Sequence, residues 1–204
     1  MCDRWGVPFS MKLKRRLLGT ALDRAGELLA KWVGEPPERA PVLAEALITA
    51  YRDAVTELGV EPMPGAAALV VALSDRVPIA VASNTSEADT RHALARSGLP
   101  EVFAAIACAG DGIAPKPAPD VYLAACAALG THPSMAVALE DSPTGVAAAR
   151  AAGMRVIGVP STPGVPLDAH RVVGSLAEVT FEALADAAAQ PLIRVTRGAT
   201  APSA

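Results

Sequence analysis

The feature that most constrains the fold is a change of pattern at residues 61–65, where Glu-Pro-Met-Pro-Gly interrupts any helix. Before this break, apolar residues recur every three or four positions, which predicts long amphipathic helices. After it, short apolar runs alternate with helical stretches. The predicted strands are residues 77–82, 102–108, 136–139 and 155–159, and the predicted helices between them are 66–73, 87–97, 120–129 and 144–152. Such alternation indicates a parallel sheet covered by helices on both faces, an α/β fold of three layers.

The N-terminal third is predicted to be entirely helical. One apolar stripe runs through residues 18–32 and ends at Gly34, and a second runs through 41–58 and ends at Gly59. These patterns divide the chain into a helical domain at 1–62, an α/β domain at 63–187 and a tail at 188–204. The tail is rich in Ala, Thr and Pro, and we expect it to be flexible.

Composition narrows the choice of partners. The chain is 51% hydrophobic but only 3% aromatic, so the core must be built from Ala, Val and Leu. No apolar run is long enough to span a bilayer, and the N-terminus shows no export signal, which favours a cytoplasmic protein. A net charge of −3 gives no electrostatic reason to expect nucleic acid. We therefore expect a small molecule as the partner, and the sequence leaves the oligomeric state open.

Polar residues follow the ends of two of the predicted strands. Ser83 and Asn84 come directly after the first strand, where a hydroxyl and the amides of a turn could hold phosphate oxygens. An alternative role for Ser83 is that of a helix N-cap. Glu140 and Asp141 come directly after the strand at 136–139. Carboxylates at this edge of a sheet indicate a magnesium site, although an acidic residue there could also act only on the helix dipole.

Lys116 lies between two prolines in a loop that precedes a predicted helix. A rigid loop can direct one ammonium group at a phosphate or at the carboxylate pair, offsetting the negative charge that builds up during phosphoryl transfer. The alternative is an ordinary solvated lysine.

In this order, the motifs resemble those of the haloacid dehalogenase superfamily, in its phosphatase and phosphomutase branch related to beta-phosphoglucomutase. Ser83-Asn84 is similar to the second motif of that family, Lys116-Pro-Ala-Pro-Asp to the third, and Glu140-Asp141-Ser142 to the fourth. The resemblance covers roughly residues 6–184. It implies a Rossmann-like core with an α-helical cap, which would be the region 1–62.

The resemblance also implies a mechanism. An aspartate attacks a phosphate monoester, and water or a second hydroxyl then discharges the aspartyl-phosphate. Ser83 and the Asn84 amide would hold the transferring phosphoryl oxygens, and Lys116 would offset their charge. Asp141, supported by Glu140, would bind Mg²⁺. The acidic pair speaks against the dehalogenase branch, which works without metal.

The chain departs from this family at its first motif, a strand that ends in Asp-x-Asp-Gly-Thr and carries the nucleophile. No Asp-x-Asp occurs in the sequence. In the family this strand lies between the strands that here carry Ser83 and Glu140, so we expect the first core strand to be missing and two rows of backbone groups to lose their partners. We therefore hypothesise that the encoded protein begins upstream of Met1.

Two classes of function follow. One is a phosphatase that hydrolyses a small phosphate monoester such as a sugar phosphate, or a phosphomutase in the full-length form. The other is a non-catalytic remnant that binds phosphate, metal or a protein. Basic residues at 12–16 would favour anionic substrates if they faced the cleft, but a solvated helix face explains them equally well.

Overall fold

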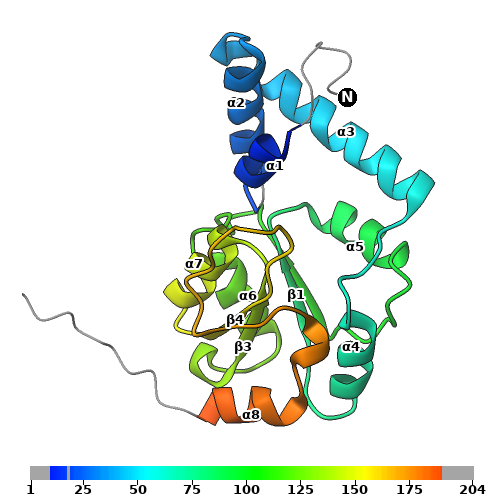
Figure 1. Ribbon diagram of the computed structural model, residues 1–204, viewed down its shortest axis with the longest axis vertical. Coiled ribbons are helices and arrows are strands. Elements are labelled where there is room, and N and C mark those ends of the chain that lie inside the picture. The colour runs from blue at the N-terminus through cyan, green and yellow to red at the C-terminus, as the bar shows by residue number, and fades with distance from the viewer. Residues whose placement is uncertain (1–9, 18, 190–204) are drawn as a thin grey trace, which may run out of the picture.

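The computed structural model describes residues 10–17 and 19–189 and shows three helices grouped above an α/β core (Figure 1). The upper helices are α1 (Met11–Leu17), α2 (Leu22–Val33) and α3 (Ala40–Leu58), with a 3-10 turn at Pro37–Arg39. They pack on one another through their own apolar cluster of Leu13, Leu29, Ala30, Ala40 and Leu43. None of the helices described is long and apolar enough to cross a bilayer.

The core alternates helices and parallel strands, as the sequence pattern predicts. Its elements are α4 (Ala66–Ser74), β1 (Ala80–Ser83), α5 (Glu87–Ala95), β2 (Ala105–Cys108), α6 (Asp120–Ala128), a 3-10 turn (Pro133–Met135), β3 (Val137–Glu140), α7 (Pro143–Ala151), β4 (Arg155–Gly158), β5 (Arg171–Val172), a 3-10 turn (Leu176–Glu178) and α8 (Phe181–Ala189). The predicted tail falls mainly on residues 190–204, which lie outside the described residues.

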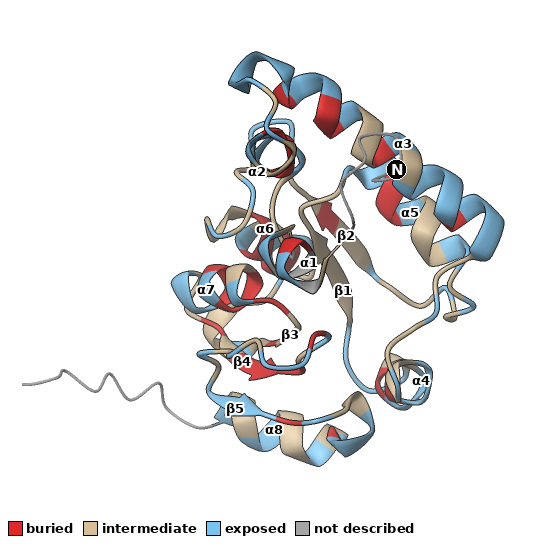
Figure 2. Cartoon of the chain, turned by 45° about the horizontal axis from the view of Figure 1, so that its top comes forward, coloured by how far each residue is buried: buried red, intermediate tan, exposed pale blue. Residues whose placement is uncertain are grey.

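Helices cover both faces of the strands, which confirms the three-layer prediction. Ala138 of β3 and Val156 of β4 face a buried cluster that includes residues of α6 and α7. The residues that alternate with them, such as Leu139 and Ile157, face α4 and α8. In Figure 2, β4 and part of α7 are coloured as buried. The two-residue period of the strands thus divides the apolar side chains between the two faces.

The sheet is divided into two parts. β1 pairs with β2, and β3 pairs with β4, which in turn pairs with β5, all in parallel register. No ladder joins β1 to β3 among the described residues. Successive residues of a strand direct their backbone groups to opposite edges. The carbonyls of Ile79 and Ser83 accept bonds on the β2 side, so those of Ala80 and Ala82 face away from β2.

The same alternation applies to β3. The carbonyls of Ala136 and Glu140 accept bonds from the β4 segment, so the backbone groups of Val137 and Leu139 face the other edge. The division thus lies between the strands that carry Ser83 and Glu140, where the family resemblance places an additional strand.

One predicted element is wrong. The stripe at residues 18–32 is not a single helix, because α1 ends at Leu17 and α2 begins at Leu22. Gly19 between them has a φ of +70°, and a Cβ there would lie 2.6 Å from Ser142 Oγ. The helix is interrupted because this backbone approaches the core closely, and only glycine has room for that contact.

Candidate functional site

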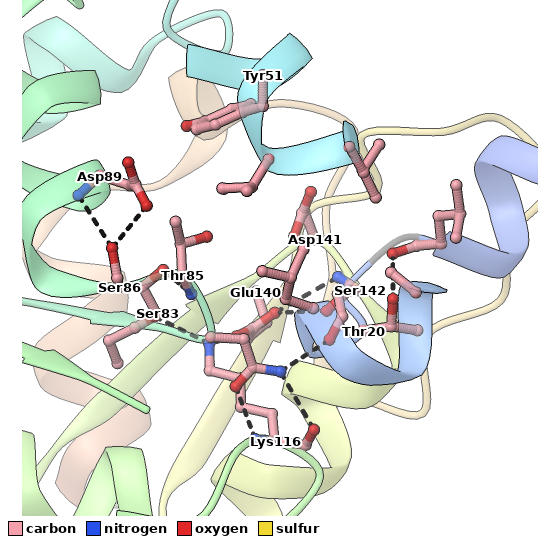
Figure 3. A pocket seen from close by; sticks show the side chains of 18 of the residues that line it. Thr20, Tyr51, Ser83, Thr85, Ser86, Asp89, Lys116, Glu140, Asp141 and Ser142 are labelled. Atoms are coloured by element: carbon pink, nitrogen blue, oxygen red, sulfur yellow. Dashed lines mark hydrogen bonds and ion pairs between the residues drawn. The ribbon is translucent and has the colours of Figure 1, made fainter. Parts of the chain in front are cut away.

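A cavity of about 710 Å³ opens at the carboxyl ends of β1 and β3, beneath the upper helices. All five predicted site residues line it: Ser83, Asn84, Lys116, Glu140 and Asp141. They come from the ends of two strands and from the loop before α6 (Figure 3). Parallel strands bring their carboxyl ends to one edge of a sheet, which explains why residues so far apart in the sequence meet here.

Ser83 is the last residue of β1, and its Oγ accepts a hydrogen bond from the Thr85 amide at 3.0 Å. It does not cap the helix that follows. The N-cap of α5 is Ser86, whose Oγ accepts from the Asp89 amide at 3.2 Å. The N-cap alternative considered for Ser83 is therefore wrong, and Ser83 lines the cavity.

Asn84 joins the segment before α2 to the lysine loop. Its Nδ2 donates to the carbonyl of Gly19 at 3.0 Å and to that of Lys116 at 3.2 Å. Its Oδ1 accepts from the Lys116 amide at 2.7 Å. The side chain therefore fixes the loop that presents the lysine.

Lys116 is not a solvated lysine, because its side chain is only 10% exposed. Its Nζ donates to Glu140 Oε1 at 2.6 Å, to the Ala82 carbonyl at 3.0 Å and to the Tyr122 hydroxyl at 3.3 Å. It also lies 4.6 Å from the centre of the Tyr122 ring. Three acceptors and a ring face hold the ammonium group in one place.

Glu140 is the centre of a buried network. The Tyr122 hydroxyl donates to Oε1, and the Ser142 hydroxyl donates to Oε2 at 3.1 Å. Burial, followed by the charge of Glu140, raises the pKa of Tyr122 well above its usual value, so the phenol stays protonated and donates. Gly145 closes the network from α7, since a Cβ there would overlap the Glu140 carboxylate.

Asp141 has different surroundings, although it is the next residue. It is partly exposed and lines the cavity, and its carboxylate has no ion pair or hydrogen bond with any residue in the described part of the chain. In Figure 3 it points toward the side of the cavity where Tyr51 of α3 lies. Of the two adjacent acids, Asp141 is the one free to take a new ligand.

Sequence reasoning missed an ion pair at the other end of the cavity. Arg52 of α3 donates from Nε to Asp89 Oδ1 at 2.6 Å and from Nη2 to Oδ2 at 3.0 Å. The hydrogen bonds from the Arg52 side chain are the main reason why the pKa of Asp89 lies below its usual range. No motif marks this pair in the sequence. The only signal is Ser86 three residues before Asp89, a pattern typical of a helix start.

The described wall of the cavity carries more negative than positive charge. Its cations are Arg52 and Lys116, and its carboxylates are Glu45, Asp89, Glu140 and Asp141. Two cations against four carboxylates leave a net charge of −2.

No group of three or more His, Cys, Asp or Glu side chains in the described residues is placed to hold a metal on its own. Mg²⁺ does not need such a group, because it is usually bound by one or two carboxylates together with water and substrate phosphate. Asp141 fits that arrangement.

The basic residues at 12–16 whose side chains the structure describes do not line the cavity. Lys12 and Arg16 are exposed, and neither lines the cavity. The side chains of Lys14 and Arg15 lie outside the described part. The solvated-face interpretation holds for the two that are described.

The chain is similar in sequence and in fold to several known proteins. The chain is 38% identical over 136 residues to Protein CbbY of Rhodobacter capsulatus and 34% identical over 146 residues to hexitol phosphatase A of Escherichia coli, matches that cover 63% and 69% of this chain. It spans 60% and 66% of their lengths, less than two thirds of either. The crystal structure of CbbY from Rhodobacter sphaeroides in complex with phosphate superposes with a TM-score of 0.73 at 30% identity, covering 89% of this chain and 87% of that one. The family model described as haloacid dehalogenase-like hydrolase matches residues 14–159, more than half of the sequence, and the chain therefore belongs to this family.

Proposed function

We propose that the cavity binds the phosphoryl group of a small phosphate monoester, in the manner of a sugar-phosphate phosphatase. The observation that carries this proposal is the meeting of Ser83, Lys116 and Asp141 at one sheet edge. A hydroxyl donor, an ammonium group and a free carboxylate are the groups that a phosphate and its metal ion require. The names of the relatives, which include a hexitol phosphatase, support this substrate class.

The charge of the cavity favours a metal-dependent site. A phosphate dianion would enter a described wall whose net charge is already −2, and Lys116 is neutralised by Glu140. We propose that Asp141 holds Mg²⁺ at this point, with Glu140 supporting it through the shared turn. When bound, the ion would offset charge on the phosphoryl oxygens.

The residues of the chain have separate roles in this proposal. The Ser83 hydroxyl and the Asn84 backbone amide orient the phosphoryl oxygens, and Lys116 faces the charge that develops on them. Glu140 and Tyr122 position Lys116, because both bond to its Nζ. Closure of the upper helices over the cavity would exclude water during the reaction.

The aspartyl-phosphate mechanism of the family needs an aspartate nucleophile, and the 204-residue sequence has no Asp-x-Asp. We propose that this chain binds phosphate and metal but turns over a chromogenic phosphate ester negligibly. Binding without catalysis, the alternative to a phosphatase, is therefore the function that we propose for this chain. The division of the sheet between β1 and β3 in the described residues favours it. A phosphomutase would show the same binding behaviour. Ester hydrolysis with Mg²⁺ that Asp141→Ala abolishes would contradict the non-catalytic proposal.

Isothermal titration calorimetry with inorganic phosphate, with and without Mg²⁺, tests the binding site. We expect phosphate binding that needs Mg²⁺ and is lost in Asp141→Asn. Asp168→Asn is the matched control, because its side chain is 94% exposed and it does not line the cavity. Equal phosphate affinity in both variants would show that Asp141 does not hold the ion.

A further inference from the structure

The cap-side wall of the cavity, formed by the N-terminal helices, is chemically unlike the end that carries Lys116. Its described lining is mainly aliphatic, from Leu17, Leu22, Ala25, Leu47 and Ile48. Tyr51 and the carboxylate of Glu45 are also present. Among the described residues of this wall, the positively charged side chain is that of Arg52.

Arg52 is already paired. Its guanidinium binds both oxygens of Asp89, one at 2.6 Å and the other at 3.0 Å. Asp89 is 5% exposed, and the Ser86 hydroxyl donates to Oδ2 at 2.6 Å, which fixes its orientation at the start of α5. A bidentate pair of this kind neutralises the guanidinium charge with that of one carboxylate, so the pair as a whole offers no net positive charge to another anion, although the Arg52 side chain is 50% exposed.

We propose that the Arg52–Asp89 pair makes the cavity selective for phosphate esters of uncharged alcohols, because it withholds the cap-side cation from the ligand. This inference rests on the proposed function of the same cavity. An ester with one phosphate would place that group at the Lys116 end and its alcohol against the aliphatic side chains. An ester with a second phosphate would place a charge among aliphatic groups and near Glu45, where no free cation of the described wall offsets its desolvation.

The test compares ligand affinities rather than turnover, so it can use this chain as it is. Calorimetry in the presence of Mg²⁺ would measure inorganic phosphate, a hexitol monophosphate and a hexose bisphosphate. We expect the wild-type chain to bind the monophosphate at least fivefold more tightly than the bisphosphate. Asp89→Asn keeps the shape of the side chain but frees the Arg52 charge, and it should shift this ratio toward the bisphosphate by about fivefold, as expected for one ion pair with a partly solvent-exposed arginine.

Two further variants keep the inference testable if Asp89→Asn folds poorly. The double variant Arg52→Gln with Asp89→Asn removes both charges and should retain the wild-type ratio. Glu45→Arg changes an exposed side chain on the same wall and places a free cation there, so it should also shift the ratio toward the bisphosphate.

The outcomes separate the two proposals. If inorganic phosphate does not bind with Mg²⁺, the proposed function fails and this inference fails with it. If phosphate binds but the wild-type chain takes the bisphosphate as tightly as the monophosphate, the selectivity inference alone is overturned. A ratio that neither Asp89→Asn nor Glu45→Arg changes would overturn it as well.

Discussion

Replacing Glu140 with glutamine and Asp141 with asparagine makes the same chemical change at two adjacent residues with opposite surroundings. The side chain of Glu140 is 6% exposed, and its Oε1 lies 2.6 Å from Lys116 Nζ, in a side chain that is itself 10% exposed. Asp141 is partly exposed and has no partner among the described residues. Each substitution removes one negative charge while preserving size, so any difference between the variants reports on the surroundings.

The magnitudes follow from burial. Removing one partner of a buried ion pair costs about 3–5 kcal/mol, because the other charge is left uncompensated. In Glu140→Gln, the amide oxygen of the introduced side chain could still accept a bond from Lys116, which places the expected loss near the lower limit, about 3 kcal/mol. For a protein of this size, such a loss lowers the melting temperature by roughly 10 °C. Asp141→Asn should change the free energy of unfolding by no more than about 0.5 kcal/mol.

Urea denaturation followed by circular dichroism at pH 7 would measure both changes, without Mg²⁺ or phosphate so that ligand binding does not contribute. Asp141→Asn, which should keep its stability, should lose Mg²⁺-dependent phosphate affinity. The variant that is affected less in stability is thus expected to be the one affected more in ligand binding. Equal destabilisation of the two variants, or a larger loss for Asp141→Asn, would refute the separation of a positioning carboxylate from a metal-binding one.

Three further predictions concern the core. The pKa of Asp89 is depressed in the folded chain, so the stabilising effect of its carboxylate is complete above the ordinary pKa of 3.8 and is lost as the pH falls through the folded-state pKa. In urea unfolding, the chain should therefore be less stable at pH 3 than at pH 7, and the difference should be smaller in Asp89→Asn. Gly145→Ala should destabilise the chain by about 1–3 kcal/mol in urea through its clash with Glu140, and a more stable variant would contradict the packing described. In hydrogen exchange, the Leu139 amide faces the division of the sheet and should exchange faster than the Ala138 amide, which points to β4; equal protection would mean that β3 is paired on both edges.

Much of the site follows from the sequence because it depends on strand ends. Ser83 and Glu140 each follow an apolar run, and the parallel arrangement brings such ends to one edge of the sheet whatever the lengths of the connecting helices. The position of Lys116 follows less directly. Its two flanking prolines predict a rigid loop that could direct the ammonium group at the carboxylates, but they leave a solvated lysine as an alternative. The contacts of Lys116 with Glu140 and Tyr122 decide between the two.

Other parts depend on contacts between distant segments, which no periodicity records. The Arg52–Asp89 pair joins residues 37 positions apart on two helices, and both positions suit a solvated helix face equally well. The break between α1 and α2 escapes the sequence pattern for a related reason. Leu18 and Leu22 continue the apolar stripe, whereas the requirement for glycine at position 19 comes from Ser142, more than a hundred residues later.

Lys116 connects the division of the sheet to the chemistry of the site. Its ammonium group bonds to the carbonyl of Ala82 in β1 and to the carboxylate of Glu140 in β3, the two strands that no ladder joins among the described residues. Because Ala82 directs its carbonyl away from β2, this bond satisfies a backbone acceptor that a neighbouring strand would otherwise pair with. The lysine therefore links the two parts of the sheet at their carboxyl ends, which is where the cavity lies. This explains how Ser83 and Asp141 remain on one cavity although their strands are not paired, and it implies that substituting Lys116 would alter the relative position of the two strand ends as well as the charge offered to a phosphate.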